Sequence, residues 1–461
     1  MYEDCVIGLD FGTDSARGVL VDSTSGEVVS SASSSYRLWA EGRFCRPEIQ
    51  QFRQNPTDYI MSMMKVMSDL FKGKDEYLKS VSGIGIDRTA STVCLVGKDG
   101  SPLSLAREHM DDPDAMFILW KDHTAQEEVE PIEKACAEAP VNYIRHSGGR
   151  YSLECFWAKV YHIVRTRPEL AREAYAAMDL CDWLTGCLIG AEKYEDYKFG
   201  RCIAASKEMW APEWNGLPPK EFFAQFDPEL ERIAGNMVSD NATSDCCAGT
   251  LCKEFAEQFG LPENVKVGYG MVDSHCGAIG SGISEGTIVV NLGTSAGIMA
   301  IMPKEKIGDS IIPGVYGQAE DLIVPGYIGY EDGPTAFGDI FAWYKRLLAY
   351  GRTPEEADRI LPKLDDDASV RKVSMRTPVS VDWLNGRRSP DPNGALRGMI
   401  AGLHKSTFEA EDAMCAPVSR IYAPDKSKAE ILENRYKAYK AGREAFSTGV
   451  ETLNGNRDGG S

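Results

Sequence analysis

Residues whose types suit phosphate chemistry gather in a short stretch near the N-terminus. Residues 6–22 read VIGLDFGTDSARGVLVD, in which two apolar runs flank a turn rich in Gly, Asp, Thr and Ser. Such runs predict the two strands of a hairpin. In the turn, Gly12, Thr13 and Ser15 offer backbone N–H groups and hydroxyls to a phosphate, and Asp10 could hold Mg²⁺ beside it. An ordinary hairpin with turn chemistry explains the same residues, so the stretch alone leaves both interpretations open.

A second informative stretch, residues 265–282, reads VKVGYGMVDSHCGAIGSG. A predicted strand enters a turn that delivers Asp273 to the start of a helix of small residues. Asp273 can be the N-cap of that helix, or a rigidly held general base that takes a proton from a sugar hydroxyl, and one role does not exclude the other. Residues 289–301, VVNLGTSAGIMAI, then repeat the order of strand, Gly-Thr-Ser turn and strand. Two such turns, with an aspartate turn before the second, predict two similar domains that face each other across a cleft.

Other candidate side chains follow predicted strands. Asp87 ends the apolar run at 81–87, where it is either a site residue or a cap for the turn. Residues 115–124, AMFILWKDHT, predict a buried strand that runs into Trp120 and Asp122. An aromatic face beside hydrogen-bonding groups is typical of a sugar or polyol pocket. Apolar residues at helical spacing predict the elements that support these side chains, namely helices at 58–71, 155–165 and 179–189.

Composition excludes some classes of partner. The chain has 461 residues, with 50 Lys and Arg against 69 Asp and Glu, so the net charge is −19. This balance argues against nucleic acid and anionic membranes as partners, because both need clustered positive charge. No apolar run is long enough to predict a membrane span, and the N-terminus lacks the pattern of a signal peptide. The 13 scattered cysteines predict a reducing, cytoplasmic setting; the trio Cys246, Cys247 and Cys252 lacks zinc-site spacing.

Taken together, several motifs resemble the FGGY carbohydrate kinases of the actin-like ATPase superfamily, and among them the ribulokinase-like members. The matching segments are the Asp273 turn and residues 8–22, 117–124, 179–183, 200–207, 292–298, 325–343 and 382–390. The resemblance implies an α/β, two-domain actin-like ATPase (ribonuclease H-like) fold. It places an N-terminal domain for sugar and phosphate binding at 1–281 and a C-terminal domain at 282–446. We expect residues 447–461 to be a disordered tail.

The resemblance also implies an activity, the ATP-dependent phosphorylation of L-ribulose in arabinose catabolism, with a homodimer as the expected assembly. It makes Asp273 the base and Asp10 the Mg²⁺ residue. The implied nucleotide contacts are Gly12, Thr13, Ser15, Arg17, Gly293, Thr294 and Ser295, with a surface salt bridge as the alternative for Arg17. The implied sugar contacts are Ala90, Lys207, Asp273 and Glu331, with Trp120 and Asp122 as weaker candidates.

Two departures from the family pattern matter. Arg88 stands where the family has a small or apolar residue, close to the expected sugar pocket, where it could alter preference or fill space. The second domain also lacks the section that should hold adenosine, and the join lies near Asp412 or Ala413. We therefore expect the second domain to be incomplete, with poor ATP affinity and very low or no activity. The alternative is a non-catalytic sugar-binding remnant, and a chaperone-like ATPase is disfavoured because it would not need the sugar contacts. The sequence does not decide among L-ribulose, D-ribulose and ribitol.

Overall fold

The computed structural model describes residues 4–238, 240–293 and 295–372. It also describes residues 377, 379–381, 383, 384, 386–388, 396–401, 433, 436, 437 and 440. The chain divides into two compact units. The first comprises residues 1–289 and 298–331, and the second comprises 290–297 and 332–461. The predicted boundary at 281/282 stays a prediction, and both the join near 412 and the tail 447–461 lie outside the described residues.

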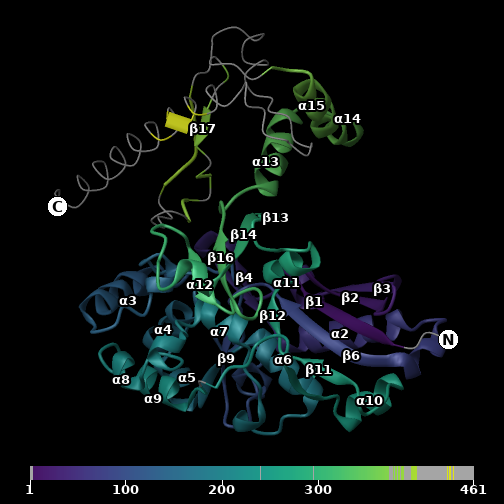
Figure 1. Cartoon of the computed structure of the whole chain (residues 1–461), viewed down its shortest axis with the longest axis vertical. Helices are drawn as coiled ribbons and strands as arrows, with labels where there is room; N and C mark the ends of the chain where they lie inside the picture. The colour runs from purple at the N-terminus through teal and green to yellow at the C-terminus, as the bar shows by residue number, and fades with distance from the viewer. Residues whose placement is uncertain are drawn as a thin grey trace. The chain divides into compact units, whose positions relative to one another are not determined.

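The first unit is built on a mixed sheet with the strand order β10-β11-β6-β1-β2-β3, in which β12 also pairs with β6 (Figure 1). The predicted hairpin is confirmed, because β1 (Cys5–Phe11) and β2 (Ser15–Asp22) are antiparallel neighbours. β1 runs parallel to β6 (Val81–Arg88), which places Asp10 opposite Asp87. β12 (Met271–Val272) also runs parallel to β6, so that Asp273 follows at the same edge. In α/β sheets, ligands bind outside the carboxyl ends of parallel strands.

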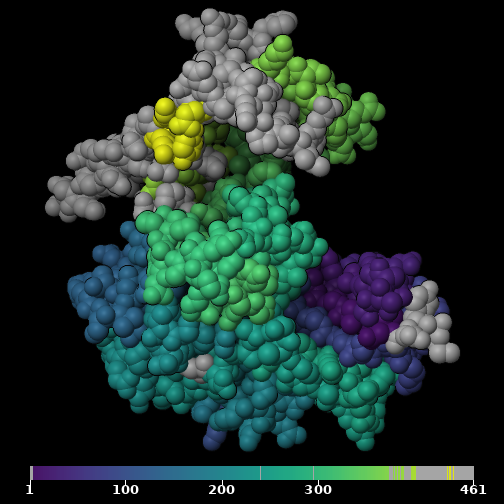
Figure 2. Space-filling view, viewed as in Figure 1, coloured from purple at the N-terminus to yellow at the C-terminus, as the bar shows by residue number. Residues whose placement is uncertain are grey.

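Helix α2 (Pro56–Leu70) covers one face of this sheet and confirms the helix predicted at 58–71. The side chain of Asn55 caps it by accepting a hydrogen bond from the Thr57 N–H group. Its buried face includes Val66 and Leu70, which share a core cluster with β1 and β2. At Gly18 on β2, a Cβ atom would lie 2.5 Å from Val66, so only glycine lets the helix approach this closely. The strands β1–β3 form the purple surface at one edge of this unit (Figure 2).

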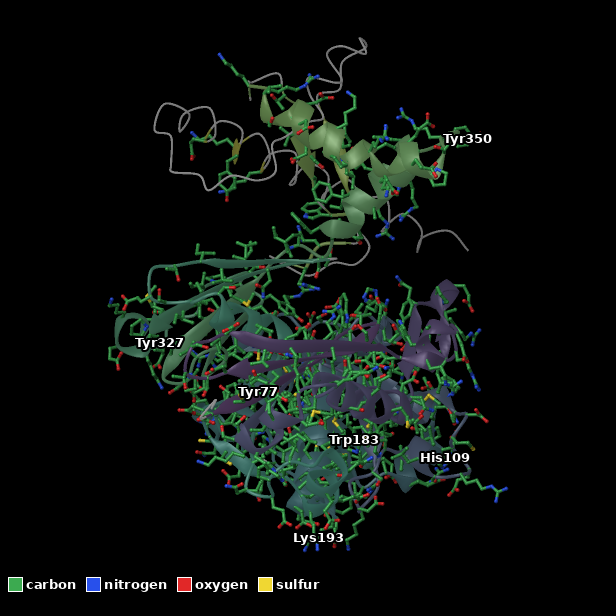
Figure 3. The ribbon with its side chains drawn as sticks, turned by 90° about the vertical axis from the view of Figure 1, so that its right-hand side faces the viewer. Tyr77, His109, Trp183, Lys193, Tyr327 and Tyr350 are labelled. Carbon is green, nitrogen blue, oxygen red and sulfur yellow. The ribbon has the colours of Figure 1, made fainter. Side chains whose placement is uncertain are left out.

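A second sheet in the same unit has the order β4-β5-β8-β7-β9. Its β8 (Phe117–Ile118) covers only two residues of the segment 115–124, which predicts a buried strand that runs into Trp120. The pairing stops because the chain turns at Leu119, whose carbonyl accepts the N–H group of Asp122. The helices predicted at 155–165 and 179–189 are confirmed as α4 (Phe156–Thr166) and α6 (Leu180–Ile189), which Asp179 caps. Trp183 of α6 lies inside the unit (Figure 3).

The first unit, which includes β16 up to Glu331, holds further strands and helices. The strands are β3 (Val28–Ser35), β4 (Cys45–Arg46), β5 (Gln51–Gln54), β7 (Val93–Val96), β9 (Ala176–Asp179), β10 (Cys247–Thr250), β11 (Lys266–Gly268), β15 (Gly317–Glu320) and β16 (Tyr327–Asp332). The helices are α1 (Arg37–Ala40), α3 (Gln126–Glu138), α5 (Pro168–Glu173), α7 (Arg201–Lys207), α8 (Lys220–Phe223), α9 (Pro228–Asn236), α10 (Lys253–Phe259), α11 (Asp273–Gly280) and α12 (Lys304–Ile307). β15 and β16 pair in antiparallel fashion and place Glu331 near the end of β16.

The second unit begins in the strand–turn–strand segment predicted at 289–301. This segment is confirmed as β13 (Val289–Leu292) and β14 (Ala296–Pro303), and the chain passes from the second unit to the first within β14. The further described elements are α13 (Gly338–Leu348), α14 (Pro354–Asp358), α15 (Ile360–Ser369), β17 (Val379–Val381) and β18 (Met399–Ala401). β17 and β18 are antiparallel neighbours. Within the described part of the chain, no helix combines the length and apolarity that crossing a membrane requires.

Candidate active site

Asp273 lies where β12 ends and α11 begins. It is the first helical residue, and Val272 is the N-cap, so the N-cap interpretation of Asp273 is wrong by one position. Its Oδ1 instead accepts the N–H group of Ser274 at 2.6 Å. Loss of solvent raises the pKa of Asp273 to about 6, although the Ser274 N–H group and Arg88 favour the charged form. A carboxylate with this pKa is charged at neutral pH and is a stronger base than an ordinary aspartate.

Two further aspartates face the same sheet edge. Asp10 and Asp87 are register partners on β1 and β6. Burial, followed by the charges of Asp10 and Asp273, raises the pKa of Asp87 to about 8. The Oδ1 atom of Asp87 is buried without a hydrogen-bond partner. The charges of Asp10 and Asp273 therefore act on Asp87, which favours a site role for Asp87 over a role confined to its own turn; that assignment stays a prediction.

This group fits a hard cation only in part. Across the described ranges, no set of three Asp, Glu, His or Cys side chains lies close enough to hold a metal ion by itself. Mg²⁺, however, is usually held by one or two carboxylates together with substrate phosphates and water. Asp10, with Asp87 beside it, offers such a set. Asp10 also forms an ion pair with Arg17 (3.2 Å), so the salt bridge considered as the alternative for Arg17 is present.

The two predicted phosphate turns close in similar ways. The N–H group of Gly12 donates to the carbonyl of Ser15 (3.0 Å), and that of Gly293 donates to the carbonyl of Ser295 (2.9 Å). Both glycine N–H groups are therefore used inside their turns, and their contacts with a phosphate stay predictions. The hydroxyl of Thr13 accepts a hydrogen bond from the Trp120 indole (3.1 Å), which ties Trp120 to the first turn.

Thr294, the middle residue of the second turn, lies outside the described residues.

Lys207 and Glu331 meet in the first unit. Lys207 ends α7, and its side chain is only 6% exposed, unlike the solvated surface lysine that its local sequence suggests. Its Nζ lies 3.5 Å from Oε2 of Glu331 and 4.2 Å from the ring centre of Tyr316. Ala90 packs at the edge of a small apolar cluster of Cys202, Met271 and Val272. The structure therefore brings Ala90 next to the strand that delivers Asp273, and it pairs Lys207 with Glu331.

His275 is a member of this site that the sequence patterns did not single out. Its side chain is completely buried, with Nδ1 3.2 Å from the Cys202 sulfur and Nε2 3.4 Å from Oε2 of Glu331. Burial by itself lowers the pKa of His275, but Cys202 and Glu331 outweigh it and raise the pKa to about 10. The only signal in the sequence is a histidine two positions after Asp273, in a helix otherwise made mostly of small residues.

Arg88, the last residue of β6, is fully buried. Its Nε and Nη2 atoms donate to the two carboxylate oxygens of Asp179, each at 2.6 Å. A bidentate pair of this kind is a strong, directional interaction. The structure therefore pairs Arg88 with Asp179 in the interior, beside Val272, its register partner. An effect of Arg88 on sugar preference stays a prediction.

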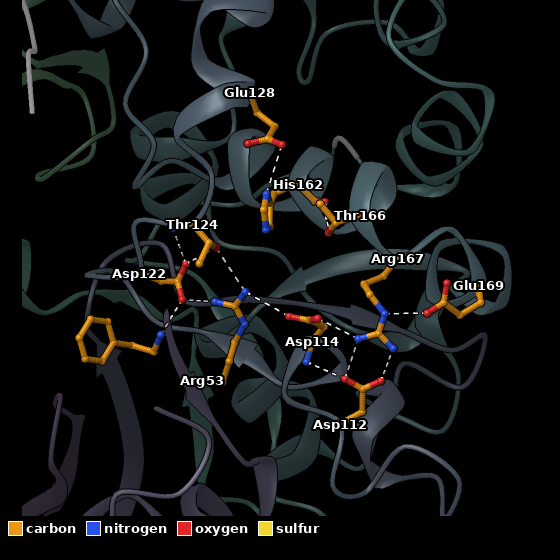
Figure 4. A network of polar contacts seen from close by, with 11 residues as sticks. Arg53, Asp112, Asp114, Asp122, Thr124, Glu128, His162, Thr166, Arg167 and Glu169 are labelled. Carbon is orange, nitrogen blue, oxygen red and sulfur yellow. Dashed lines mark hydrogen bonds and ion pairs between the residues drawn. The ribbon is translucent and has the colours of Figure 1, made fainter. Parts of the chain in front are cut away.

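Asp122 takes part in a different network. Its carboxylate, 0% exposed, accepts hydrogen bonds from the Phe52 N–H group, from Arg53 and from Thr124. Through Arg53 and Asp114 the network continues to Arg167, as Figure 4 shows. These partners all lie outside the Asp273 group. The contacts account for Asp122 as a buried support of the segment that follows β8.

The model of the FGGY family of carbohydrate kinases, N-terminal domain, matches residues 5–280, and the model of its C-terminal domain matches residues 288–423. The chain is 37% identical over 418 residues to a protein named ribulokinase from Vibrio parahaemolyticus, covering 87% of this chain and 74% of that protein. It is 28% identical over 463 residues to a ribulokinase from Staphylococcus epidermidis, covering 93% of this chain and 84% of that one.

Solved structures with similar folds include xylulose kinase from Rhodospirillum rubrum, with a TM-score of 0.69 and 21% identity over 88% of this chain and 74% of that chain. Glycerol kinase from Plasmodium falciparum has a TM-score of 0.67 and 15% identity, covering 90% of this chain and 75% of that chain. At these identities the likeness concerns the fold.

Proposed function

Since this chain belongs to the FGGY family of carbohydrate kinases, with its mixed α/β, two-domain fold, we propose that it transfers the γ-phosphate of ATP to a terminal hydroxyl of L-ribulose. The observation that carries this proposal is the coupled group of Asp10, Asp87 and Asp273 at one sheet edge. Phosphoryl transfer needs such a combination, in which one carboxylate accepts a proton and another holds the cation that neutralises charge on the phosphates.

In the proposed mechanism, Asp273 accepts the proton of the sugar hydroxyl as the oxygen attacks the γ-phosphorus in line. Its place at the start of α11 fixes the carboxylate, and rigid positioning supplies most of the rate enhancement in such reactions. Asp10, with Asp87 beside it, would hold Mg²⁺, which when bound neutralises charge on the phosphate oxygens. The proposed nucleotide contacts in the first unit are Gly12, Thr13, Ser15 and Arg17. Those in the second unit, Gly293, Thr294 and Ser295, stay predictions.

On the sugar side, Glu331 accepts hydroxyl hydrogen bonds and Lys207 donates them. Ala90 leaves room for the substrate because its side chain is a single methyl group. Trp120 supports this arrangement through its hydrogen bond to Thr13. Asp122 contributes by holding its own segment in place, since Arg53 already occupies its carboxylate.

Nucleotide affinity is where we expect this chain to be weak. The helix α13 of the second unit buries none of its residues, as expected if a section that should pack on it is missing near residue 412. This observation favours the second candidate function, a sugar-binding remnant without turnover. A cytoplasmic homodimer remains our expectation for the protein in the cell.

ADP release coupled to a colour reaction tests the proposal, with L-ribulose, D-ribulose and ribitol as alternative substrates. We expect slow, sugar-dependent ADP release that requires millimolar ATP. Robust turnover at micromolar ATP would contradict the weak nucleotide site. Isothermal titration separates the two candidate functions, because binding of L-ribulose without any turnover at saturating ATP supports the sugar-binding remnant.

A further inference from the structure

His275 joins three elements of the first unit that each carry a proposed sugar residue. It belongs to α11, which begins with Asp273. Its Nδ1 contacts Cys202 of α7, the helix that ends with Lys207. Its Nε2 lies 3.4 Å from the Glu331 carboxylate on β16. A single buried imidazole therefore links the proposed base to both groups that would bind the sugar.

The Oε2 atom of Glu331 lies near two nitrogens at once, Nε2 of His275 (3.4 Å) and Nζ of Lys207 (3.5 Å). Both distances exceed the ~2.7–2.9 Å of a charge-assisted hydrogen bond. The imidazole and the ammonium group therefore hold Oε2 from two sides by long polar contacts. The raised pKa of His275 fits this geometry, because a protonated imidazole completes the balance around Glu331.

Apolar neighbours make this imidazole costly to bury. Cys202, Met271 and Val272 form the cluster against which α11 begins, and an apolar side chain would fill such a place without loss. Taking a charged or polar ring out of water is unfavourable unless its partners compensate for the lost hydration. A role confined to packing does not explain why the ring nitrogens face Cys202 and Glu331.

We propose that His275 is a positioning residue that orients the Glu331 carboxylate for the substrate sugar and so sets sugar affinity. The inference rests on the proposed function, since it assumes that Glu331 contacts the sugar. We expect changes at His275 to alter the affinity for the sugar and to leave the affinity for the nucleotide unchanged.

Two variants of similar size separate this role from packing. In His275→Gln the amide nitrogen can take the place of Nε2 and still donate to Glu331. In His275→Asn the shorter side chain keeps only the contact with Cys202. We expect His275→Asn to weaken L-ribulose binding by ~10- to 100-fold, the worth of one hydrogen bond to a charged group, while His275→Gln stays within about fivefold of the unaltered chain.

Isothermal titration with L-ribulose, without nucleotide, measures this in the full chain, with thermal unfolding of each variant as the control for folding. In Glu331→Gln, adding His275→Asn should cause little further loss, because the coupling acts through Glu331. Equal binding by His275→Asn and the unaltered chain, or equal losses in both variants, would overturn the inference while leaving the proposed function in place. Failure of the unaltered chain to bind L-ribulose would overturn the proposed function and this inference with it.

Discussion

Helices α2 and α13 both carry an apolar stripe, but they differ in what they bury. α2, in the first unit, buries eight residues, among them Met63 and Leu70, against the sheet that ends in the aspartate group. α13, in the second unit, buries none, and its Leu347 is 57% exposed. Tyr350, just beyond α13, is 93% exposed, whereas Trp183 in the first unit is 3% exposed (Figure 3).

The difference shows that an amphipathic pattern predicts a helix but does not supply the surface that covers it. In the first unit that surface exists, so the side chains of the site are supported by packed elements. The described part of the second unit gives α13 little cover. We therefore expect sugar binding and catalytic positioning to depend on well-packed residues, and nucleotide binding to be the weaker function.

The largest expected effect is on catalysis. Asp273→Asn removes the proposed base and should lower kcat by ~10²–10⁴-fold, while L-ribulose affinity by titration changes little. Asp69→Asn is the matched control, because that carboxylate forms an exposed ion pair with Lys65 and should leave turnover unchanged. Unchanged turnover in Asp273→Asn would remove Asp273 from the base role.

The next largest expected effect is on the free energy of unfolding, and it comes from changing Arg88. Arg88→Met leaves the carboxylate of Asp179 buried without its partner, which should lower the free energy of unfolding by about 3–5 kcal/mol. Arg37→Met breaks an exposed pair with Glu41 and should cost less than ~1 kcal/mol. Urea unfolding measures both, and equal losses would show that the Arg88 pair is not buried as described.

A matched pair of leucines tests the comparison of the two helices directly. Leu70→Ala in α2 should destabilise the protein by about 2–5 kcal/mol, because it opens a cavity in a closed core. Leu347→Ala in α13 should change stability by less than ~0.5 kcal/mol. A large loss for Leu347→Ala would mean that α13 is covered in solution.

The smallest effect concerns pH. Because burial raises the pKa of Asp273 to about 6, this base is charged above that pH and protonated below it. kcat/KM should therefore fall tenfold per pH unit below about 6 and level off above it. With an ordinary aspartate, whose pKa is 3.8, kcat/KM would fall only near that pH, and a profile flat down to pH 3.8 would contradict the raised pKa. In the variant Asp273→Asn, kcat/KM should no longer fall in this way below pH 6.

Local patterns predicted the hairpin of β1 and β2, the strand β6 and the helices α2, α4 and α6, because their signals lie within short windows of sequence. The aspartate turn at Asp273 was also readable, although its helix begins one residue earlier than an N-cap role requires. Only the resemblance to a family predicted Lys207 as a sugar contact, since its own neighbours in the sequence predict an exposed side chain.

The contacts that local patterns missed are those between distant segments. Cys202, His275 and Glu331 meet only after α7, α11 and β16 are packed, and nothing in their own windows marks them as partners. Asp122 shows the reverse case. Its local sequence predicted a sugar pocket, but its carboxylate forms a buried ion pair with Arg53, which is distant in sequence.

The most direct test of the central claim is to identify the product. Phosphorus NMR of a mixture of the full chain, L-ribulose, Mg²⁺ and millimolar ATP should show a new phosphomonoester coupled to the protons of a terminal carbon, and Asp273→Asn should abolish it. ATP that disappears only by hydrolysis, or a phosphomonoester that forms equally with Asp273→Asn, would contradict the account.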